Sequence, residues 1–192
     1  MEKKVGTAMT SCVRIILTGP ESTGKTNLAA QLAERYNTVF IPEYAREYIQ
    51  NLGRPYDYSD IEHIAKYQAD QMKEFSSREL KILFVDTYLV ITKIWFEWIY
   101  KRYPQWLNDE LLKTKNDLYL LCEPDLPWYP DPVRENGGEA RKVLFNLYKN
   151  ELEKNALHYR CVSGKGVERV RHAFEQIDDF LYERGIKNEG NA

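Results

Sequence analysis

The segment GPESTGKT, at residues 19–26, combines the residue types that hold a phosphate group. Gly19, Gly24, Lys25 and Thr26 satisfy the spacing GxxxxGKT. Glycines at these positions let successive backbone N–H groups point at phosphate oxygens. A lysine there reaches the outer phosphates, and a threonine hydroxyl binds Mg²⁺. The sequence therefore predicts a P-loop for ATP, formed by Gly19, Glu21, Ser22, Thr23, Gly24, Lys25, Thr26 and Asn27.

A carboxylate follows the apolar run ILFV at residues 82–85 and would complete the nucleotide site. Asp86 ends this expected strand. If the strand lies beside the one that precedes the P-loop, the carboxylate holds Mg²⁺ or one of its water ligands. The alternative is a plain cap at the end of a strand. The predicted metal ligands are therefore Thr26 and Asp86.

A glutamate and an arginine lie about one helical turn apart in the segment FIPEYAREY, as Glu43 and Arg46. At the carboxyl edge of a parallel sheet this pair would face the ligand crevice. Glu43 would then accept a hydroxyl proton or hold a sugar hydroxyl. The sequence leaves open the alternative that Glu43 is only an acid at a helix N-terminus, favoured by the helix dipole.

A proline-rich segment at residues 122–139 is the longest expected loop, with four prolines and two glycines. It contains Trp128 and Arg134, and Arg141 opens the next expected helix. Arginines on a mobile segment suit a lid that closes over the triphosphate and stabilises charge during transfer. The alternative is a solvated loop with surface arginines.

Two further groups of residues have less specific patterns. Ser163 and Gly164, after the last expected strand, would lie against the adenine or simply form a turn. Trp95, Trp98, Ile99, Arg102 and Trp106 recur at helical spacing. The favoured interpretation of these five is one packed face, and the alternative is a stacking platform for a substrate ring.

Strand-like and helix-like segments alternate along the chain, which indicates an α/β fold with a mainly parallel sheet. Strands are expected at 13–17, 38–41, 81–86, 117–122 and 157–163. Helices are expected at 25–36, 59–75, 88–103, 138–155 and 166–185, with a capping box of Ser59 and Glu62. With the P-loop, this predicts the three-layer α/β/α sandwich of P-loop NTPases, with a five-stranded sheet and a helical or loop lid.

Composition places the chain among ordinary globular proteins. Its 192 residues suit one domain at 13–185, with an N-terminal extension at 1–12 and a flexible tail at 186–192. The net charge of -2 gives no reason to expect nucleic acid as a partner. No run approaches the ~20 apolar residues of a membrane span, and the three isolated cysteines suggest buried free thiols in a reducing compartment. The expected location is the cytoplasm; the sequence does not indicate the oligomeric state.

Four segments together resemble the ribosylnicotinamide kinase domain of NadR-type proteins, an AAA-like family among the P-loop small-molecule kinases. They are GPESTGKT, PEYAREY at 42–48, FVDT followed by TK at 92–93, and PDLPWYPDPVR at 124–134. The P-loop is generic, whereas the second and fourth segments are specific and occur in the right order. The resemblance covers the chain from about residue 13 to residue 180.

The resemblance implies ATP- and Mg²⁺-dependent phosphorylation of the 5′ hydroxyl of nicotinamide riboside, which gives nicotinamide mononucleotide for NAD salvage. Glu43 or Asp86 would orient the attacking hydroxyl, and Arg134 with Arg141 would cover the phosphates. The implied catalytic residues are Lys25, Glu43, Asp86 and Arg134. The expected contacts of the nucleoside-like substrate are Glu43, Tyr44, Arg46, Asp86, Tyr88 and Trp128, and those of the nucleotide beyond the P-loop are Arg134, Arg141, Ser163 and Gly164.

The chain departs from the family pattern at two positions. Tyr88 stands where the family has a second acid after DT, and Pro132 stands where its lid tends to have glycine. NadR-type proteins often carry an adenylyltransferase domain and some carry a helix-turn-helix, for which 192 residues leave no room. The alternatives are a P-loop kinase for another nucleoside-like molecule and a regulatory nucleotide-dependent ATPase, which would not need an acceptor site at Glu43 and Arg46.

Overall fold

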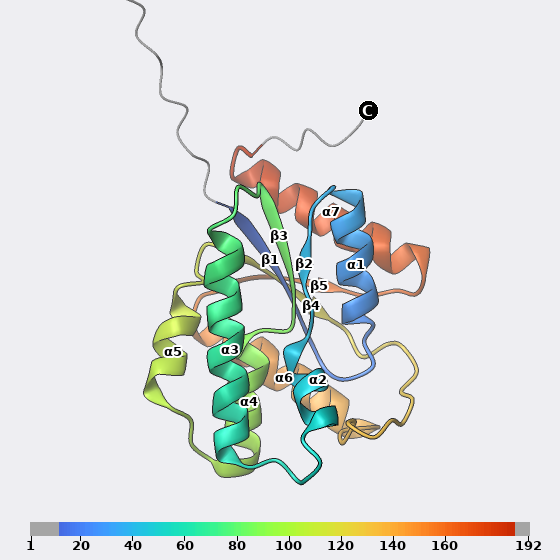
Figure 1. Ribbon diagram of the computed structural model, residues 1–192. Helices are drawn as coiled ribbons and strands as arrows, with labels where there is room; N and C mark the ends of the chain where they lie inside the picture. Colours follow the sequence, from blue (N-terminus) through green and yellow to red (C-terminus); the bar gives the residue numbers. More distant parts are fainter. Residues whose placement is uncertain (1–11, 187–192) are drawn as a thin grey trace, which may run out of the picture.

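The computed structural model describes residues 12–186, in which a parallel five-stranded sheet forms the centre of the molecule (Figure 1). The strand order is β2-β3-β1-β4-β5. The strands are β1 (Val13–Thr18), β2 (Phe40–Ile41), β3 (Ile82–Asp86), β4 (Leu118–Cys122) and β5 (His158–Val162). The predicted α/β fold and the five predicted strands are confirmed, with β2 shorter than expected.

Successive residues of the central strands enter two separate hydrophobic cores, because side chains alternate between the faces of a sheet. On β1, Ile16 packs into one core, while Ile15 and Leu17 pack into the other. The first core is formed with α3 (Tyr58–Ser76), α4 (Leu89–Tyr100), α5 (Gln105–Leu112) and α6 (Glu139–Lys154). The second core is formed with α1 (Lys25–Arg35) and α7 (Val167–Glu183). The molecule is therefore the three-layer sandwich that the sequence predicted.

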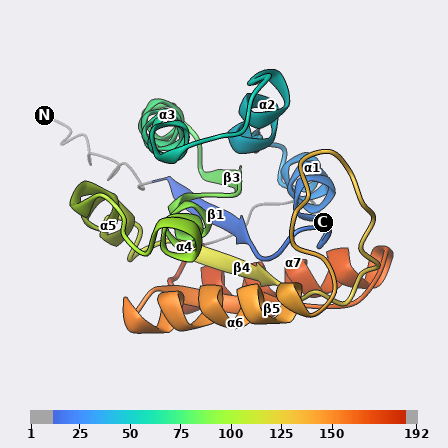
Figure 2. The same cartoon turned by 90° about the horizontal axis from the view of Figure 1, so that it is seen from below.

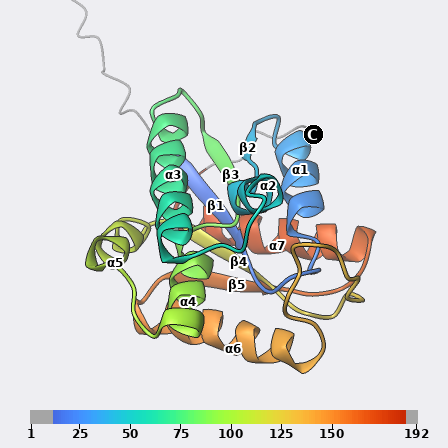
Figure 3. The ribbon, with the colours of Figure 1, turned by 60° about the horizontal axis from the view of Figure 1, so that its bottom comes forward.

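The carboxyl edge of the sheet carries the P-loop, the short helix α2 (Tyr44–Asn51) and the proline-rich segment. Figure 2, seen from this end, shows the segment after β4 arching past the start of α1 before it enters α6. Figure 3 shows α2 at the same end of the sheet. The positioning of the P-loop depends on the parallel pairing of β1 with β3, in which Leu17 is opposite Asp86.

Three expectations about helices need correction. Helix α3 begins at Tyr58, one residue earlier than predicted, and its capping box is formed by Asp57 and Asp60 rather than by Ser59 and Glu62. The Asp57 carboxylate accepts from the backbone N–H groups of Ser59 and Asp60, which leaves Ser59 inside the helix. The long helix expected to reach residue 103 ends at Tyr100, and the separate helix α5 was not predicted. A helix that starts after Glu43, as α2 does, was considered only as an alternative.

The packed tryptophan face that the sequence favoured is correct for Trp95 and Trp106, which pack against the first core, and wrong for Trp98 and Ile99. Trp98 and Ile99 are 42% and 40% exposed, so they are not core residues. Trp106 packs against the first core, and its indole N–H donates to Glu62 Oε1 at 3.3 Å. Helical spacing alone could not separate the buried side of α4 from the side that faces solvent.

A buried ion pair joins α4 to α6. Lys93 binds Glu151, and Lys93 Nζ also donates to Asn108 Oδ1 at 2.9 Å. Asn155 Nδ2 donates to the same Glu151 carboxylate at 2.6 Å. Burying a charge pair costs free energy unless further hydrogen bonds compensate both charged groups. These contacts provide that compensation and link α4 to α6.

No helix within residues 12–186 has the length and apolar character to cross a membrane. The three cysteines are free, and of these Cys122 is buried, whereas Cys12 and Cys161 are half-buried. The predicted extension at 1–12 and tail at 186–192 fall outside the described residues, except for Cys12 and Ile186.

The close approach of the P-loop to β4 gives a prediction about Gly19. Its φ is +137°, and a Cβ at this position would lie 2.6 Å from the carbonyl oxygen of Cys122. We expect Gly19→Ala to lower the free energy of unfolding by about 2–4 kcal/mol, from backbone strain and overpacking together. Urea unfolding followed by circular dichroism measures the change.

Gly53→Ala is the matched control. Gly53 also has positive φ, at +69°, but a Cβ at this position would have none of the described residues within 4 Å. The substitution should cost only the backbone strain of about 1–2 kcal/mol. Equal losses in the two variants would show that Cys122 does not restrict the P-loop.

Candidate active site

The P-loop backbone surrounds the side chain of its own lysine. Lys25 Nζ donates to the carbonyl oxygens of Gly19 and Pro20, each at 2.9 Å. The buried Thr23 hydroxyl donates to the carbonyl of Pro20 at 2.9 Å. Gly24, in the left-handed conformation with φ of 76°, precedes the first residue of α1. A glycine-containing loop that leads directly into a helix N-terminus in this way is an arrangement that binds phosphate.

Asp86 lies beside this loop, as the strand register requires. Its side chain is fully buried, and one oxygen, Oδ2, has no hydrogen-bond partner within the described part of the chain. Burial raises the pKa of the Asp86 carboxyl, whereas the charge of Lys25 and a hydrogen bond with Thr26 act to lower it. A buried carboxylate with a free oxygen next to a threonine hydroxyl fits Mg²⁺, which takes few protein ligands and completes its shell with phosphate and water.

A metal ion at this place would not be held by protein side chains alone. Within residues 12–186, no group of three or more histidine, cysteine, aspartate or glutamate side chains is arranged to hold a metal ion. Any Mg²⁺ bound at Thr26 and Asp86 would thus depend on nucleotide phosphates for its remaining ligands.

A cavity of about 370 Å³ extends from the P-loop to the side of α4 and α6. Its phosphate end is lined by the predicted nucleotide residues Gly19, Glu21, Ser22, Thr23, Gly24, Lys25, Thr26 and Asn27. The lining also includes Glu43 and Arg46 of the α2 segment, Thr87, and four aromatic residues, Tyr56, Trp95, Trp98 and Tyr148, which together are called the aromatic end of the cavity. The structure thus brings the predicted P-loop and the Glu43–Arg46 pair into one space.

Glu43 is placed to act on a ligand in this cavity. It is the N-cap residue of α2, yet its side chain makes no capping hydrogen bond. Burial raises the pKa of the Glu43 carboxyl, the charge of Lys25 acts to lower it and that of Asp86 acts to raise it.

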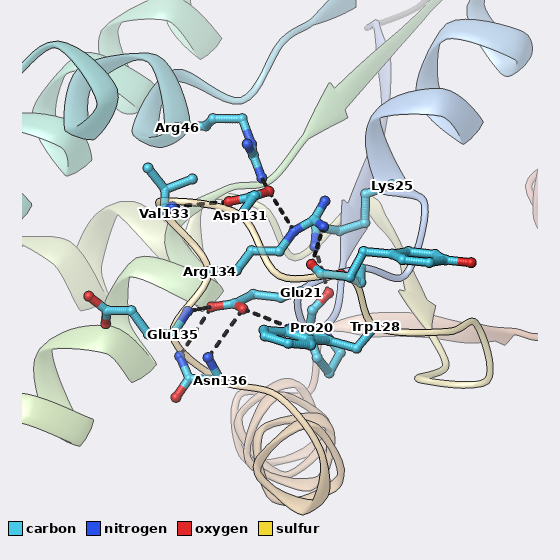
Figure 4. Close-up of polar contacts among 12 residues, drawn as sticks. Pro20, Glu21, Lys25, Arg46, Trp128, Asp131, Val133, Arg134, Glu135 and Asn136 are labelled. Atoms are coloured by element: carbon cyan, nitrogen blue, oxygen red, sulfur yellow. Dashed lines mark hydrogen bonds and ion pairs between the residues drawn. The ribbon is translucent and has the colours of Figure 1, made fainter.

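The proline-rich segment lies against the P-loop through one carboxylate (Figure 4). Glu21 accepts hydrogen bonds from the backbone N–H groups of Glu135 and Asn136, each at 3.2 Å, and from the Asn136 side-chain amide at 3.2 Å. The indole N–H of Trp128 also donates to Glu21, at 3.4 Å. The hydrogen bonds to Glu21 therefore hold this lid segment against the P-loop. Trp128 takes part in this contact and does not line the cavity.

Arg134 and Arg141 differ in placement. Arg134 lines the cavity and pairs with Asp131, with 2.9 Å between Nε and Oδ2. Arg141 is buried, and its two terminal nitrogens donate to the carbonyls of Leu126, at 2.8 Å, and Ser22, at 3.2 Å. In this structure Arg141 therefore ties the lid to the P-loop backbone rather than lining the cavity.

Five other predicted site residues lie outside the cavity lining: the buried Asp86, Tyr44, Tyr88, Ser163 and Gly164. Tyr44 stacks on Tyr67 with ring centroids 3.8 Å apart, and Tyr88 is buried in the first core. The backbone N–H of Ser163 donates to His172 Nδ1 at 3.2 Å. The backbone N–H of Gly164 donates to Asp125 Oδ2 at 2.7 Å.

The sequence offered Trp95 and Trp98 as a stacking platform only as an alternative, and it missed the other two residues of the aromatic end, Tyr56 and Tyr148. The rings of Tyr56 and Trp95 meet edge to face, with centroids 4.9 Å apart at 75°, and Tyr148 reaches the cavity from α6. The helical spacing of the tryptophans was visible in the sequence, but the favoured interpretation of that spacing was a packed helix face. Nothing local in the sequence indicated that Tyr56, from the loop before α3, or Tyr148 would join them.

A sequence model of the family described as an AAA domain matches residues 14–169. Among curated relatives, the trifunctional NAD biosynthesis/regulator protein NadR of Salmonella typhimurium is 28% identical over 177 residues. The alignment covers 89% of this chain and 43% of the relative, so the chain spans less than half of that protein's length.

Two solved structures have the same fold. The crystal structure of NadR protein in complex with NR matches with a TM-score of 0.73 and 22% identity, over 95% of this chain and 52% of that one. Thymidylate kinase from Ehrlichia chaffeensis matches with a TM-score of 0.59 and 15% identity, over 89% of this chain and 99% of that one. At these identities the likeness shows the fold, which is that of P-loop kinases.

The contacts of Glu21 predict how firmly the lid is held. Glu21→Ala removes the shared acceptor, and hydrogen bonds to a charged group are worth about 1.5–3 kcal/mol each. We expect tryptic cleavage after Arg134 to become at least about tenfold faster, because cleavage follows the population of the open segment. Mass spectrometry of the timed digest measures the rate.

Glu139→Ala is the control, because Glu139 is an exposed glutamate at the start of α6 that pairs with Lys142 and not with the lid. Its cleavage after Arg134 should match the unaltered protein. Identical rates in Glu21→Ala and Glu139→Ala would mean that Glu21 does not hold the lid.

Proposed function

We propose that this chain, which belongs to the AAA domain family whose model matches residues 14–169, is an ATP-dependent kinase that phosphorylates the 5′ hydroxyl of nicotinamide riboside. The observation that carries the proposal is the single cavity that joins the P-loop, the carboxylate of Glu43 and an aromatic end. A phosphoryl donor and an acceptor alcohol must meet in one such space. The product would be nicotinamide mononucleotide.

The phosphate end of the cavity supplies the donor side of the reaction. Lys25 and the P-loop N–H groups would hold the β- and γ-phosphates of ATP, and Arg134 would stabilise charge on the transferred group. Thr26 and Asp86 would hold Mg²⁺, which supplies further neutralisation of phosphate charge when bound. The lid that Glu21 fastens to the P-loop would exclude water, so that the phosphoryl group passes to the acceptor and not to water.

The acceptor base is Glu43 rather than Asp86. Both were possible from the sequence, but Glu43 lines the cavity, whereas Asp86 is fully buried and hydrogen-bonded with Thr26. In this assignment the 5′ hydroxyl attacks the γ-phosphorus, its proton passes to Glu43, and ADP leaves. A positioned carboxylate of this kind contributes about 10²–10⁴ to the rate.

The aromatic end favours a flat, cationic ring as the rest of the acceptor. Nicotinamide riboside carries its positive charge on a pyridinium ring, and the faces of tryptophan and tyrosine attract cations. The cavity volume of about 370 Å³ lies within the range of small-molecule sites. A NadR protein, whose fold is compared with this one above, has been solved in complex with NR, the usual abbreviation of nicotinamide riboside.

An ADP-release assay with Mg²⁺ and ATP tests the proposal on a panel of acceptors: nicotinamide riboside, adenosine, uridine, thymidine and none. We expect stimulation by nicotinamide riboside, with a loss of about 10²–10³ in kcat for Lys25→Ala because a preorganised charge at the phosphates is removed. If only another nucleoside stimulates ADP release, the proposed kinase activity stands and the proposed substrate is wrong. ADP release at the same rate with every acceptor and without one would contradict the proposal.

The second candidate is a regulatory ATPase that uses the same P-loop without an acceptor. Glu43→Gln separates the two functions, because it keeps the size of the side chain and removes the base. For the kinase, acceptor-dependent turnover falls while ATP binding persists. For the regulatory ATPase, ATP turnover is unchanged.

A further inference from the structure

One carboxylate oxygen joins the acceptor-side helix to the lid. Asp131 Oδ2 accepts a hydrogen bond from Arg46 Nη2 at 2.8 Å and lies 2.9 Å from Arg134 Nε. The other oxygen, Oδ1, accepts from the backbone N–H of Val133 at 3.0 Å. Figure 4 shows Arg46 reaching Asp131 from α2, while Arg134 approaches it from within the lid.

Both arginines also line the cavity, where ligands would bind. Arg46 follows Glu43 by about one helical turn, so it belongs to the same helix that the proposed base caps. Arg134 is further held by the carbonyl of Tyr129, to which its Nη1 donates at 2.6 Å. Two guanidinium groups this close repel one another unless an anion lies between them, and Asp131 provides that anion.

The contacts of Asp131 matter for geometry more than for stability. Partial burial acts to raise the pKa of its carboxyl, but the hydrogen bonds from Arg46 and from the Val133 N–H outweigh it, and the pKa lies below its ordinary value. Asp131 is therefore ionised at neutral pH. Solvent-accessible ion pairs contribute only about 0–1 kcal/mol to the free energy of unfolding. The main consequence of the contacts is therefore that α2 and the lid are held in a defined position relative to each other.

We propose that Asp131 is a positioning residue that couples α2 to the lid, so that ATP and the acceptor each bind more tightly when the other is present. The proposal rests on the proposed function for the identity of the acceptor. An acceptor that orders α2 also orders Arg134 through the shared oxygen, and ATP that orders the lid also orders Arg46. Such coupling is reciprocal, and it typically changes affinity about 5–150-fold.

The same proline-rich segment contains a second aspartate–arginine pair that provides a matched control. Asp125 Oδ1 lies 2.6 Å from Arg169 Nη1, and Asp125 Oδ2 accepts from the Gly164 N–H at 2.7 Å. Neither Asp125 nor Arg169 belongs to the lining of the cavity described above. Loss of this pair should loosen the segment without affecting the link between Arg46 and Arg134.

The experiment is a calorimetric titration with AMP-PNP, a non-hydrolysable ATP analogue, in the presence and absence of saturating nicotinamide riboside. In the unaltered protein, nicotinamide riboside should lower the Kd for AMP-PNP about tenfold. In Asp131→Asn the ratio of the two Kd values should fall to about one, and in Asp125→Asn it should stay at the unaltered value. An unaltered ratio in Asp131→Asn, or a ratio lost equally in both variants, would overturn the proposal.

Hydrogen exchange gives a readout that does not need the acceptor. AMP-PNP should slow exchange in residues 44–51 of the unaltered protein, and this effect should be absent in Asp131→Asn while the P-loop remains protected. If nicotinamide riboside fails to bind, the proposed substrate is wrong, and hydrogen exchange alone decides about Asp131. Slowing that persists in Asp131→Asn, or that never occurs in the unaltered protein, overturns the coupling.

Discussion

The parallel pairing of β1 with β3 is the constraint on which the site depends. Because Leu17 is opposite Asp86, the loop that leaves β1 and the carboxylate that ends β3 must lie at the same edge of the sheet. The loop then passes so close to β4 that Gly19 has no room for a side chain beside Cys122. Thr87 follows Asp86 with a φ of 70°, which is rare for a β-branched residue and typical of backbone strained at a functional site.

Contacts between opposite charges position the segments that surround the cavity at that edge of the sheet. Lys25, Arg46 and Arg134 line the cavity together with Glu21 and Glu43. Glu21 accepts from donors of the lid, and Asp131 binds two arginines, so these two acids link separate segments of the chain around the cavity. Glu43 and Asp86, by contrast, keep raised pKa values through burial, which is common for carboxyls that take part in chemistry.

The sequence predicted most of what neighbouring residues determine, with the cap of α3 as an exception, and missed what distant segments determine. The P-loop and the buried strands follow from local spacing, and Asp86 needed only the usual neighbour relation of the strands. The start of α3 was misplaced because Asp57 outcompetes Ser59 as the cap, and Asp60 is held further by Arg54 at 2.7 Å. The aromatic end of the cavity and the link of Arg46 to Asp131, 85 positions later, form only through tertiary contacts that periodicity does not encode.

Direct transfer of the phosphoryl group to the riboside is the central claim, and isotope labelling tests it most directly. The protein would be incubated with Mg²⁺, nicotinamide riboside and ATP labelled with ¹⁸O on the γ-phosphoryl group, and the products would be analysed by mass spectrometry. The account predicts nicotinamide mononucleotide that carries the labelled phosphoryl oxygens, in amounts equal to the ADP formed. Labelled inorganic phosphate with no labelled mononucleotide would contradict it.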